Sequence, residues 1–229
     1  MSVEKFEFPA RGFYIVATKV GEAEYFLEQL KGAQGHYRVF SYNLSAFVSA
    51  VRSITFSMQA VMSKYPNFPE WYALHQQVLK EDLLAKYFLN LRNLTQKVGT
   101  VPVGHTGMMR DGEIIHLSYF VSVEELKDAP NGEVTKLATQ YFKSILSLVK
   151  KCYEDFWAYV DPRAIFTEKG LDFLGWTIED IEESVGLPRG WTDITGNPNE
   201  NRTERLALLQ REYQGDEMME DYFSKYELK

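Results

Sequence analysis

Hydrophobic residues recur every three or four positions over most of this chain, which is the spacing of an amphipathic helix. The pattern is clearest over residues 36–64, where the apolar stripe consists of Phe40, Leu44, Phe47, Val48, Val51, Met58, Val61 and Met62. The same spacing predicts further helices over residues 21–31, 70–96 and 133–159. The charged residues 80–82 predict a break in the second of these.

A second stripe runs beside the apolar one in helix 36–64. It consists of serines spaced by four: Ser41, Ser45, Ser49, Ser53 and Ser57. Small side chains let another helix approach closely, and hydroxyl groups also suit a face in contact with water. The sequence leaves both interpretations open.

Two segments lack the helical spacing and have the residue pattern of β-strands. Residues 101–109 and 114–121 flank Asp111-Gly112, a dipeptide that favours a tight hairpin turn. Residues 13–17 are β-branched and aromatic, which predicts an edge strand or an extended lead-in.

After the last long helix, a short helix is predicted over residues 177–183 and an amphipathic one over 200–226, interrupted near Gly215. The predicted fold is therefore mainly α: an antiparallel helical bundle over residues 1–165, with a β-hairpin inserted at 98–122. Residues 166–229 form a helical C-terminal extension that packs on the bundle or on a partner.

Composition narrows the class of protein. With 45% hydrophobic and 14% aromatic residues among 229, the chain has enough apolar side chains for a core. We expect a cytoplasmic protein without a membrane segment, because there is no signal-peptide pattern and no run of about 20 apolar residues. The single cysteine, Cys152, excludes an internal disulfide. His105 and His116 flank the hairpin without an evident third ligand, so neither a metal site nor a cofactor is expected.

Charge is unevenly distributed. Residues 1–97 carry 11 Lys and Arg against 8 Asp and Glu, whereas residues 98–229 carry 14 against 24. Strong non-specific nucleic-acid binding is not expected from such a chain, because it needs a clustered basic face. A small basic site on the N-terminal half is compatible with the count, and the acidic remainder favours solubility.

Known catalytic and nucleotide-binding motifs are missing from the sequence. It contains no Gly-x-x-x-x-Gly-Lys-Ser/Thr, no Gly-x-Gly-x-x-Gly and no His-Glu-x-x-His.

One segment carries a resemblance to a known family. Residues 82–97 read Asp-Leu-Leu-Ala-Lys-Tyr-Phe-Leu-Asn-Leu-Arg-Asn-Leu-Thr-Gln-Lys, an apolar helix that ends on a charged and polar group. Together with residues 46–56 and 68–72, this segment resembles the HEPN superfamily of nucleotide-binding helical domains, in particular bacterial members. The resemblance covers roughly residues 20–160. It implies a homodimer and a role in stress response, toxin–antitoxin pairing or phage defence.

The resemblance also implies a site. In the family, an Arg, a polar residue and a His four to six positions after the Arg form a metal-independent RNase centre. Arg92 and Asn93 match the first two, but Lys97 stands where the His is expected. An unperturbed lysine, with a pKa of about 10.4, is a poor general base near neutrality, yet it still binds phosphate. Arg92, Asn93 and Lys97 are therefore the predicted phosphate-binding residues, provided that the helix ends or bends between Arg92 and Lys97.

Three functions follow as hypotheses. The favoured one is a catalytically degenerate HEPN-like protein that binds phosphate, RNA or a nucleotide, or that acts as a scaffold. The second is an active metal-independent endoribonuclease that uses Arg92, with Lys97, His36 or His75 as proton carrier. The third is a protein-interaction module whose acidic C-terminal helix binds a basic partner and can be removed, as residues 200–229, without unfolding the bundle. Arg92 is equally compatible with a structural role, capping helix carbonyls or pairing with Glu81 or Glu28.

Overall fold

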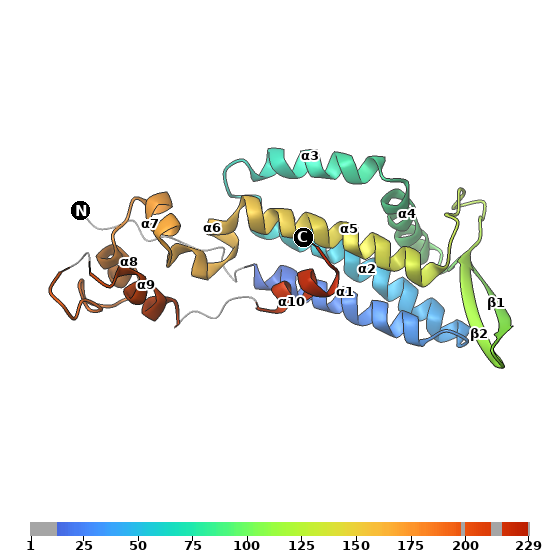
Figure 1. The fold of residues 1–229 in the computed structure, drawn as a ribbon. Helices are drawn as coiled ribbons and strands as arrows, with labels where there is room; N and C mark the ends of the chain where they lie inside the picture. The colour runs from blue at the N-terminus through green and yellow to red at the C-terminus, as the bar shows by residue number, and fades with distance from the viewer. Residues whose placement is uncertain (1–12, 198–199, 212–216, 229) are drawn as a thin grey trace. The chain divides into compact units, whose positions relative to one another are not determined.

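The computed structural model describes residues 13–197, 200–211 and 217–228. The described chain is mainly helical with one antiparallel hairpin, which confirms the predicted class (Figure 1). It divides into two compact units: unit 1 comprises residues 1–14 and 150–222, and unit 2 comprises residues 15–149 and 223–229. The boundary drawn from sequence, after residue 165, lies inside unit 1.

The elements follow one another in chain order. Helices of the N-terminal half are α1 (Tyr14–Gly32), α2 (Tyr37–Met62), α3 (Phe68–Glu81) and α4 (Leu83–Lys97), followed by strands β1 (Val103–Arg110) and β2 (Glu113–Phe120). The remaining elements are α5 (Val134–Asp155), α6 (Trp157–Val160), a 3₁₀ helix η1 (Pro162–Ile165), α7 (Glu168–Leu174), α8 (Ile178–Ser184), α9 (Arg202–Gln210) and α10 (Glu217–Lys225). The expected helix 133–159 is thus divided at Phe156. The interruption expected near Gly215 lies outside the described residues.

The start of α1 corrects one expectation. Residues 14–17, predicted as a strand or an extended lead-in, are the first turn of this helix. Val16, Ala17 and Val20 are all fully buried, at the i, i+1 and i+4 positions of one helical face. Burial of that face therefore outweighs the strand preference of the β-branched and aromatic residues.

Helix α2 is the central helix of unit 2, and its apolar stripe is buried from Phe40 to Met62 except at Val61, which is half-buried. Its length and composition would also allow it to cross a membrane, a criterion that core helices of soluble proteins meet; 44% of its most apolar window is buried in this fold. Along the serine stripe, the hydroxyls of Ser41, Ser49, Ser53 and Ser57 donate to the carbonyl four residues earlier. Gln96 of α4 donates to Ser49 Oγ at 3.1 Å, so a second helix does approach the stripe there.

The predicted break at residues 80–82 is confirmed and has a local cause. Asp82 separates α3 from α4 with an extended backbone, and its Oδ1 accepts from the backbone N–H groups of Leu84 and Ala85 at 2.8 and 3.1 Å. These bonds satisfy two of the four free N–H groups at the start of α4.

An aromatic cluster connects the elements of unit 2. The ring of Phe88 on α4 stacks on Tyr141 of α5 with centroids 4.6 Å apart, and it meets Phe120 of β2 edge to face at 5.6 Å. Phe47 of α2 packs edge to face against Phe88 at 6.3 Å. One side chain therefore contacts three other elements of the unit.

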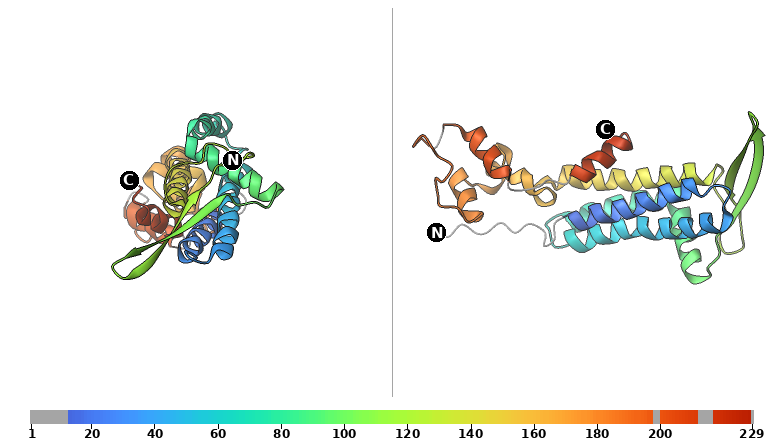
Figure 2. Two further views of the ribbon diagram at one scale, coloured as in Figure 1. Left: turned by 90° about the vertical axis from the view of Figure 1, so that its right-hand side faces the viewer. Right: turned by 90° about the horizontal axis from the view of Figure 1, so that it is seen from below.

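The hairpin has the turn that the sequence predicts. Asp111 and Gly112 have φ of 51° and 85°, the positive pair of a type I′ turn, and β1 and β2 pair one to one from Val103–Phe120 to Arg110–Glu113. In the end-on view of Figure 2 (left) the hairpin crosses the end of unit 2.

Both hairpin histidines pack on the turn between α1 and α2. His105 stacks on Tyr37 at 4.2 Å, and its Nδ1 is 2.9 Å from Ser118 Oγ. A Cβ at Gly35 would lie 2.9 Å from the His116 ring, and Gly35 also has φ of +88°, so only glycine fits there. Burial lowers the pKa of His105 from its ordinary value of 6.5.

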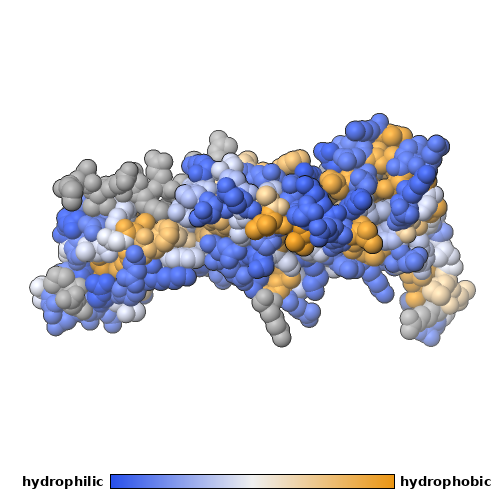
Figure 3. Space-filling model, turned by 90° about the horizontal axis from the view of Figure 1, so that it is seen from above, coloured by the Kyte–Doolittle hydropathy of each residue, from blue (hydrophilic) through white to orange (hydrophobic). Residues whose placement is uncertain are grey.

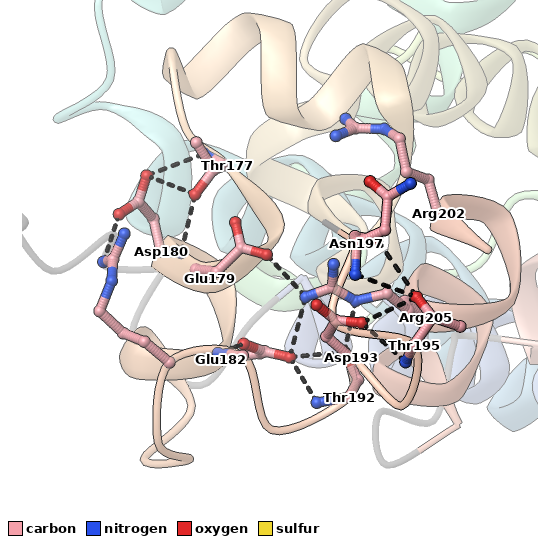
Figure 4. Close-up of polar contacts among 12 residues, drawn as sticks. Thr177, Glu179, Asp180, Glu182, Thr192, Asp193, Thr195, Asn197, Arg202 and Arg205 are labelled. Atoms are coloured by element: carbon pink, nitrogen blue, oxygen red, sulfur yellow. Dashed lines mark hydrogen bonds and ion pairs between the residues drawn. The ribbon is translucent and has the colours of Figure 1, made fainter. Parts of the chain in front are cut away.

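Unit 1 has its own apolar core and a buried ion-pair network (Figure 4). The core consists of Ile165, Phe166, Leu171, Ile178, Ile181, Leu206 and Leu209. Beside it, Arg205 of α9 is 3% exposed and Glu182 of α8 is 0% exposed, with Arg205 Nη2 at 3.3 Å from Glu182 and at 2.7 Å from Glu179.

Glu182 is also the acceptor that organises the loop after α8. Its carboxylate accepts from the backbone N–H groups of Gly190 and Thr192 and from the Thr192 hydroxyl. Burial raises the pKa of Glu182, but the hydrogen bonds of Thr192 and Gly190 and the charge-assisted bond from Arg205 outweigh burial, and the net pKa is lowered. The network therefore connects α8, the loop and α9.

We predict that Glu182→Gln destabilises unit 1 by about 3 kcal/mol, because breaking a buried charge pair leaves Arg205 only partly paired. Three of the four tryptophans, Trp157, Trp176 and Trp191, lie in unit 1, so denaturation followed by tryptophan fluorescence reports on it. The matched control is the exposed neighbour Glu183→Gln, with an expected loss below about 0.5 kcal/mol. Equal losses in the two variants would contradict the role of Glu182.

The free energy of unfolding should also fall at acid pH, because the ring of His105 becomes protonated there. Since its folded pKa lies below 6.5, the neutral ring's contribution is complete above that pH and is lost as pH falls through the folded pKa. His105→Phe removes the hydrogen bond with Ser118, which should lower the free energy of unfolding at pH 7.5 by about 1 kcal/mol. The midpoint of thermal unfolding should therefore be lower in this variant, and it should depend less on pH than in wild type. His36→Gln, at an exposed position, should leave the dependence as in wild type. An equally steep acid loss in His105→Phe would contradict this role.

Candidate functional site

The residues that carry the HEPN resemblance lie near the end of α4. Arg92 is half-buried, and its Nη1 donates to Asn93 Oδ1 at 3.3 Å. Its Nε is buried without a hydrogen-bond partner in the described structure. Neither suggested acidic partner is paired with it, since Glu28 binds Lys31 and Glu81 accepts from Gln77.

The condition set for a joint site of Arg92 and Lys97 is not met. Helix α4 continues to Lys97, so the two residues lie about 140° apart around its axis at 3.6 residues per turn. Asn93 and Lys97, four residues apart, share one face. The structure therefore brings Arg92 to Asn93, and Asn93 to the face of Lys97, but it does not bring the two cations together.

A cavity of about 450 Å³ lies elsewhere in unit 2, between four helices. Its volume is within the range of small-molecule sites. Its lining comprises Arg52 and Thr55 of α2, Tyr72, Gln76, Leu79 and Lys80 of α3, Ala85, Lys86, Leu89 and Asn90 of α4, and Tyr141 and Ile145 of α5. Arg92, Asn93 and Lys97 are not among these residues.

The polar lining of this cavity is strongly biased toward hydrogen-bond donors and positive charge. Arg52, Lys80 and Lys86 are cations, and no Asp or Glu is present among the lining residues. The described structure pairs none of these three with a carboxylate. Such a site suits an anion.

Arg52 is held in place from two sides. Its Nη1 donates to Thr55 Oγ1 at 3.1 Å, and its guanidinium lies 4.2 Å from the centroid of the Phe56 ring. A bond to a neutral hydroxyl and a cation–π contact leave its charge uncompensated. The guanidinium is therefore oriented before any ligand arrives.

Two tyrosines contribute neutral hydroxyl groups. Burial raises the pKa of Tyr141 to about 12, although the nearby charge of Arg52 opposes the shift. Burial also raises the pKa of Tyr72, against the hydrogen bond with Thr55 and the charge of Arg52. Both therefore remain protonated near neutral pH and can donate to a ligand oxygen.

The ionisable side chains in the lining of the cavity are those of arginine, lysine and tyrosine. Its lining contains no histidine, cysteine, serine or carboxylate, and its tyrosines are held in the neutral form. In the part of the chain that the structure describes, no group of three or more His, Cys, Asp or Glu is arranged to hold a metal ion.

The surface near this cavity is partly apolar. Leu74 and Val78 of α3 are 72% and 63% exposed, and Leu83 at the start of α4 is 82% exposed. Figure 3, which looks onto α3, shows apolar side chains among hydrophilic ones on this face.

From the sequence, none of the residues that line this cavity was assigned to a site. A signal was present in the helix periodicity. Tyr72, Gln76, Leu79 and Lys80 lie at i, i+4, i+7 and i+8, and Ala85, Lys86, Leu89 and Asn90 also share one helical face. The break at Asp82 changes the direction of the chain between α3 and α4, so that both faces contribute to one cavity (Figure 1).

Comparison with known proteins identifies the family. No curated protein and no solved structure matches the chain. The family model described as bacteriophage lambda protein ea47 matches residues 25–159, more than half of the chain. This range includes every residue of the cavity as well as Arg92, Asn93 and Lys97, and the match bears on the HEPN resemblance in neither direction. The chain belongs to the bacteriophage lambda Ea47 family.

Proposed function

We propose that this chain is a binding protein, without catalytic activity, for a small phosphate-bearing ligand of the nucleotide class, held in the cavity between α2, α3, α4 and α5. The observation that carries this proposal is the gathering of Arg52, Lys80 and Lys86 around one cavity whose lining contains no carboxylate. Arg52 would bind phosphate oxygens through its fixed guanidinium, and the two lysines would add charge at the more exposed side.

The other lining groups suit the rest of a nucleotide. Tyr141 presents a ring and a neutral hydroxyl, while Gln76 and Asn90 present amides that both donate and accept. Leu79, Leu89 and Ile145 supply apolar surface for a base. A mainly apolar cavity with a few placed polar groups is the usual form of such a site.

This proposal retains the phosphate or nucleotide binding of the HEPN hypothesis. It assigns the main phosphate contact to Arg52 in place of Arg92. Arg92, Asn93 and Lys97 stay predicted as phosphate-binding residues of α4, with Arg92 on one side of the helix and Lys97 on another. Nuclease activity is disfavoured, because Lys97 is exposed at the end of α4 and no histidine lines the cavity. We also propose a cytoplasmic site of action, as expected from the sequence.

The interaction hypothesis needs a different test from the one first suggested. Arg205, Leu206 and Leu209 of α9 belong to the buried interior of unit 1, and Tyr226 packs on Phe142 in unit 2 at 5.2 Å. Removing residues 200–229 would therefore damage both units. The net charge of −9 in unit 1, from 10 Lys and Arg against 19 Asp and Glu, keeps a basic partner as the second candidate.

Titration calorimetry with adenosine monophosphate and with inorganic phosphate tests the favoured function. We expect binding of the nucleotide that weakens at least tenfold in Arg52→Gln and that falls as salt rises, because a charge-assisted bond contributes about 1.5–3 kcal/mol. Lys127→Gln, which removes an exposed lysine of the loop after β2, is the matched control and should bind as wild type. Absence of binding at millimolar nucleotide, or equal affinity in all three proteins, would contradict the proposal.

A cleavage assay separates binding from catalysis. Purified protein incubated with single-stranded RNA in EDTA should leave the RNA intact, as should Arg92→Ala. Cleavage by wild type that disappears in Arg92→Ala would instead establish the endoribonuclease alternative.

A further inference from the structure

The hairpin at the end of unit 2 has one strand edge that no other strand covers. Within the described residues, β1 pairs with β2, while β2 makes one further bridge, from Tyr119 to Glu133. No described strand therefore pairs with the outer edge of β1, and an isolated two-stranded sheet is only marginally stable.

The backbone groups on this edge can be assigned from the register. A two-residue turn closes on a hydrogen-bonded pair, here Arg110 with Glu113. Hydrogen-bonded and non-hydrogen-bonded pairs then alternate along the ladder. The N–H and C=O groups of His105, Gly107 and Met109 and the C=O of Val103 consequently point outward from β1, while the Val103 N–H donates to Val101 O at 2.9 Å.

This edge lacks the features that normally prevent edge-to-edge pairing. Residues 103–109 contain no Lys, Arg, Asp, Glu or Pro, and the pairing of β1 with β2 has no bulge. Met108, Met109 and Ile114 are 50%, 72% and 63% exposed. The base of the hairpin, in contrast, is fixed by the stack of His105 on Tyr37 and by Phe120 in the aromatic cluster. An uncharged edge is thus presented to solvent beyond a fixed base.

We propose that β1 pairs antiparallel with β1 of a second copy of this chain, so that two hairpins form one continuous four-stranded sheet about a two-fold axis at Thr106. In this register the outward-pointing residues meet each other, Gly107 opposite His105 and Met109 opposite Val103. Met108 lies opposite Gly104, so the larger side chain covers the smaller on both sides of the axis. The absence of charge over residues 103–109 means that self-pairing brings no like charges together.

The chemistry of the edge favours a second copy over another partner. A closed two-fold contact satisfies the open edges of both molecules at once and leaves no further edge on β1. Seven paired residues span roughly 23 Å, which is a small interface. We therefore expect a reversible dimer that forms at micromolar concentrations. This inference is independent of the ligand proposed for the cavity.

Sedimentation velocity over about 1 to 100 μM tests the dimer, with the 26.5 kDa chain as monomer reference. Thr106→Lys places two exposed cations at the axis and should raise the dissociation constant at least tenfold. Thr106→Val, which keeps strand preference and adds no charge, should dimerise as wild type. A monomer throughout this range, or a dimer unaffected by Thr106→Lys, would overturn the proposal.

A disulfide test fixes the register. In a non-hydrogen-bonded antiparallel pair the Cα atoms are about 4.5 Å apart, within the range that a disulfide spans. Thr106→Cys should therefore form a covalent dimer under mild oxidation, whereas Glu113→Cys, at the tip of β2, should not. Cys152 is fully buried and does not compete. Crosslinking of Glu113→Cys without Thr106→Cys would exclude this register.

Discussion

The packing of Phe88 is the contact on which the arrangement of unit 2 depends. This single ring stacks on Tyr141, meets Phe120 edge to face and packs against Phe47, so it joins α4 to α5, to β2 and to α2. Aromatic pairs of this kind add to the free energy of burial and also fix the angle between elements. Tyr141 is at the same time a lining residue of the cavity, and Phe120 is the base of the hairpin. The candidate binding site and the candidate dimer edge are thus both positioned by the same core.

The two units of the chain also differ in net charge. Unit 2 carries 15 Lys and Arg against 13 Asp and Glu, while unit 1 carries the −9 that dominates the overall charge. Three cations of unit 2 meet at a cavity without acidic lining residues, whereas the buried cation of unit 1, Arg205, is fully engaged by Glu179 and Glu182. A paired buried charge organises structure, and unpaired charges around a cavity are available to a ligand.

The sequence predicted most elements because their signals are local. The apolar stripe of α2, the Asp82 break and the Asp111-Gly112 turn each determine structure over a few residues. The first turn of α1 was missed because its β-branched residues favour a strand. The burial of Val16 and Val20 on one helical face, which outweighs that preference, cannot be read from the sequence. The cavity was missed for a related reason: Arg52 and Tyr141 are 89 positions apart in the sequence and line one cavity only in the folded chain. The motif at Arg92 drew attention because its residues are adjacent in sequence, yet the continuous helix turns Arg92 and Lys97 apart.

The central claim is that phosphate binds at Arg52, and side-chain nuclear magnetic resonance tests it most directly. The Nε–Hε signals of individual arginines, assigned by substitution, can be followed while adenosine monophosphate is added. The account predicts a saturable shift of the Arg52 signal with little change at Arg205, whose guanidinium is engaged within unit 1. A shift confined to Arg92, or no shift at any arginine, would contradict it.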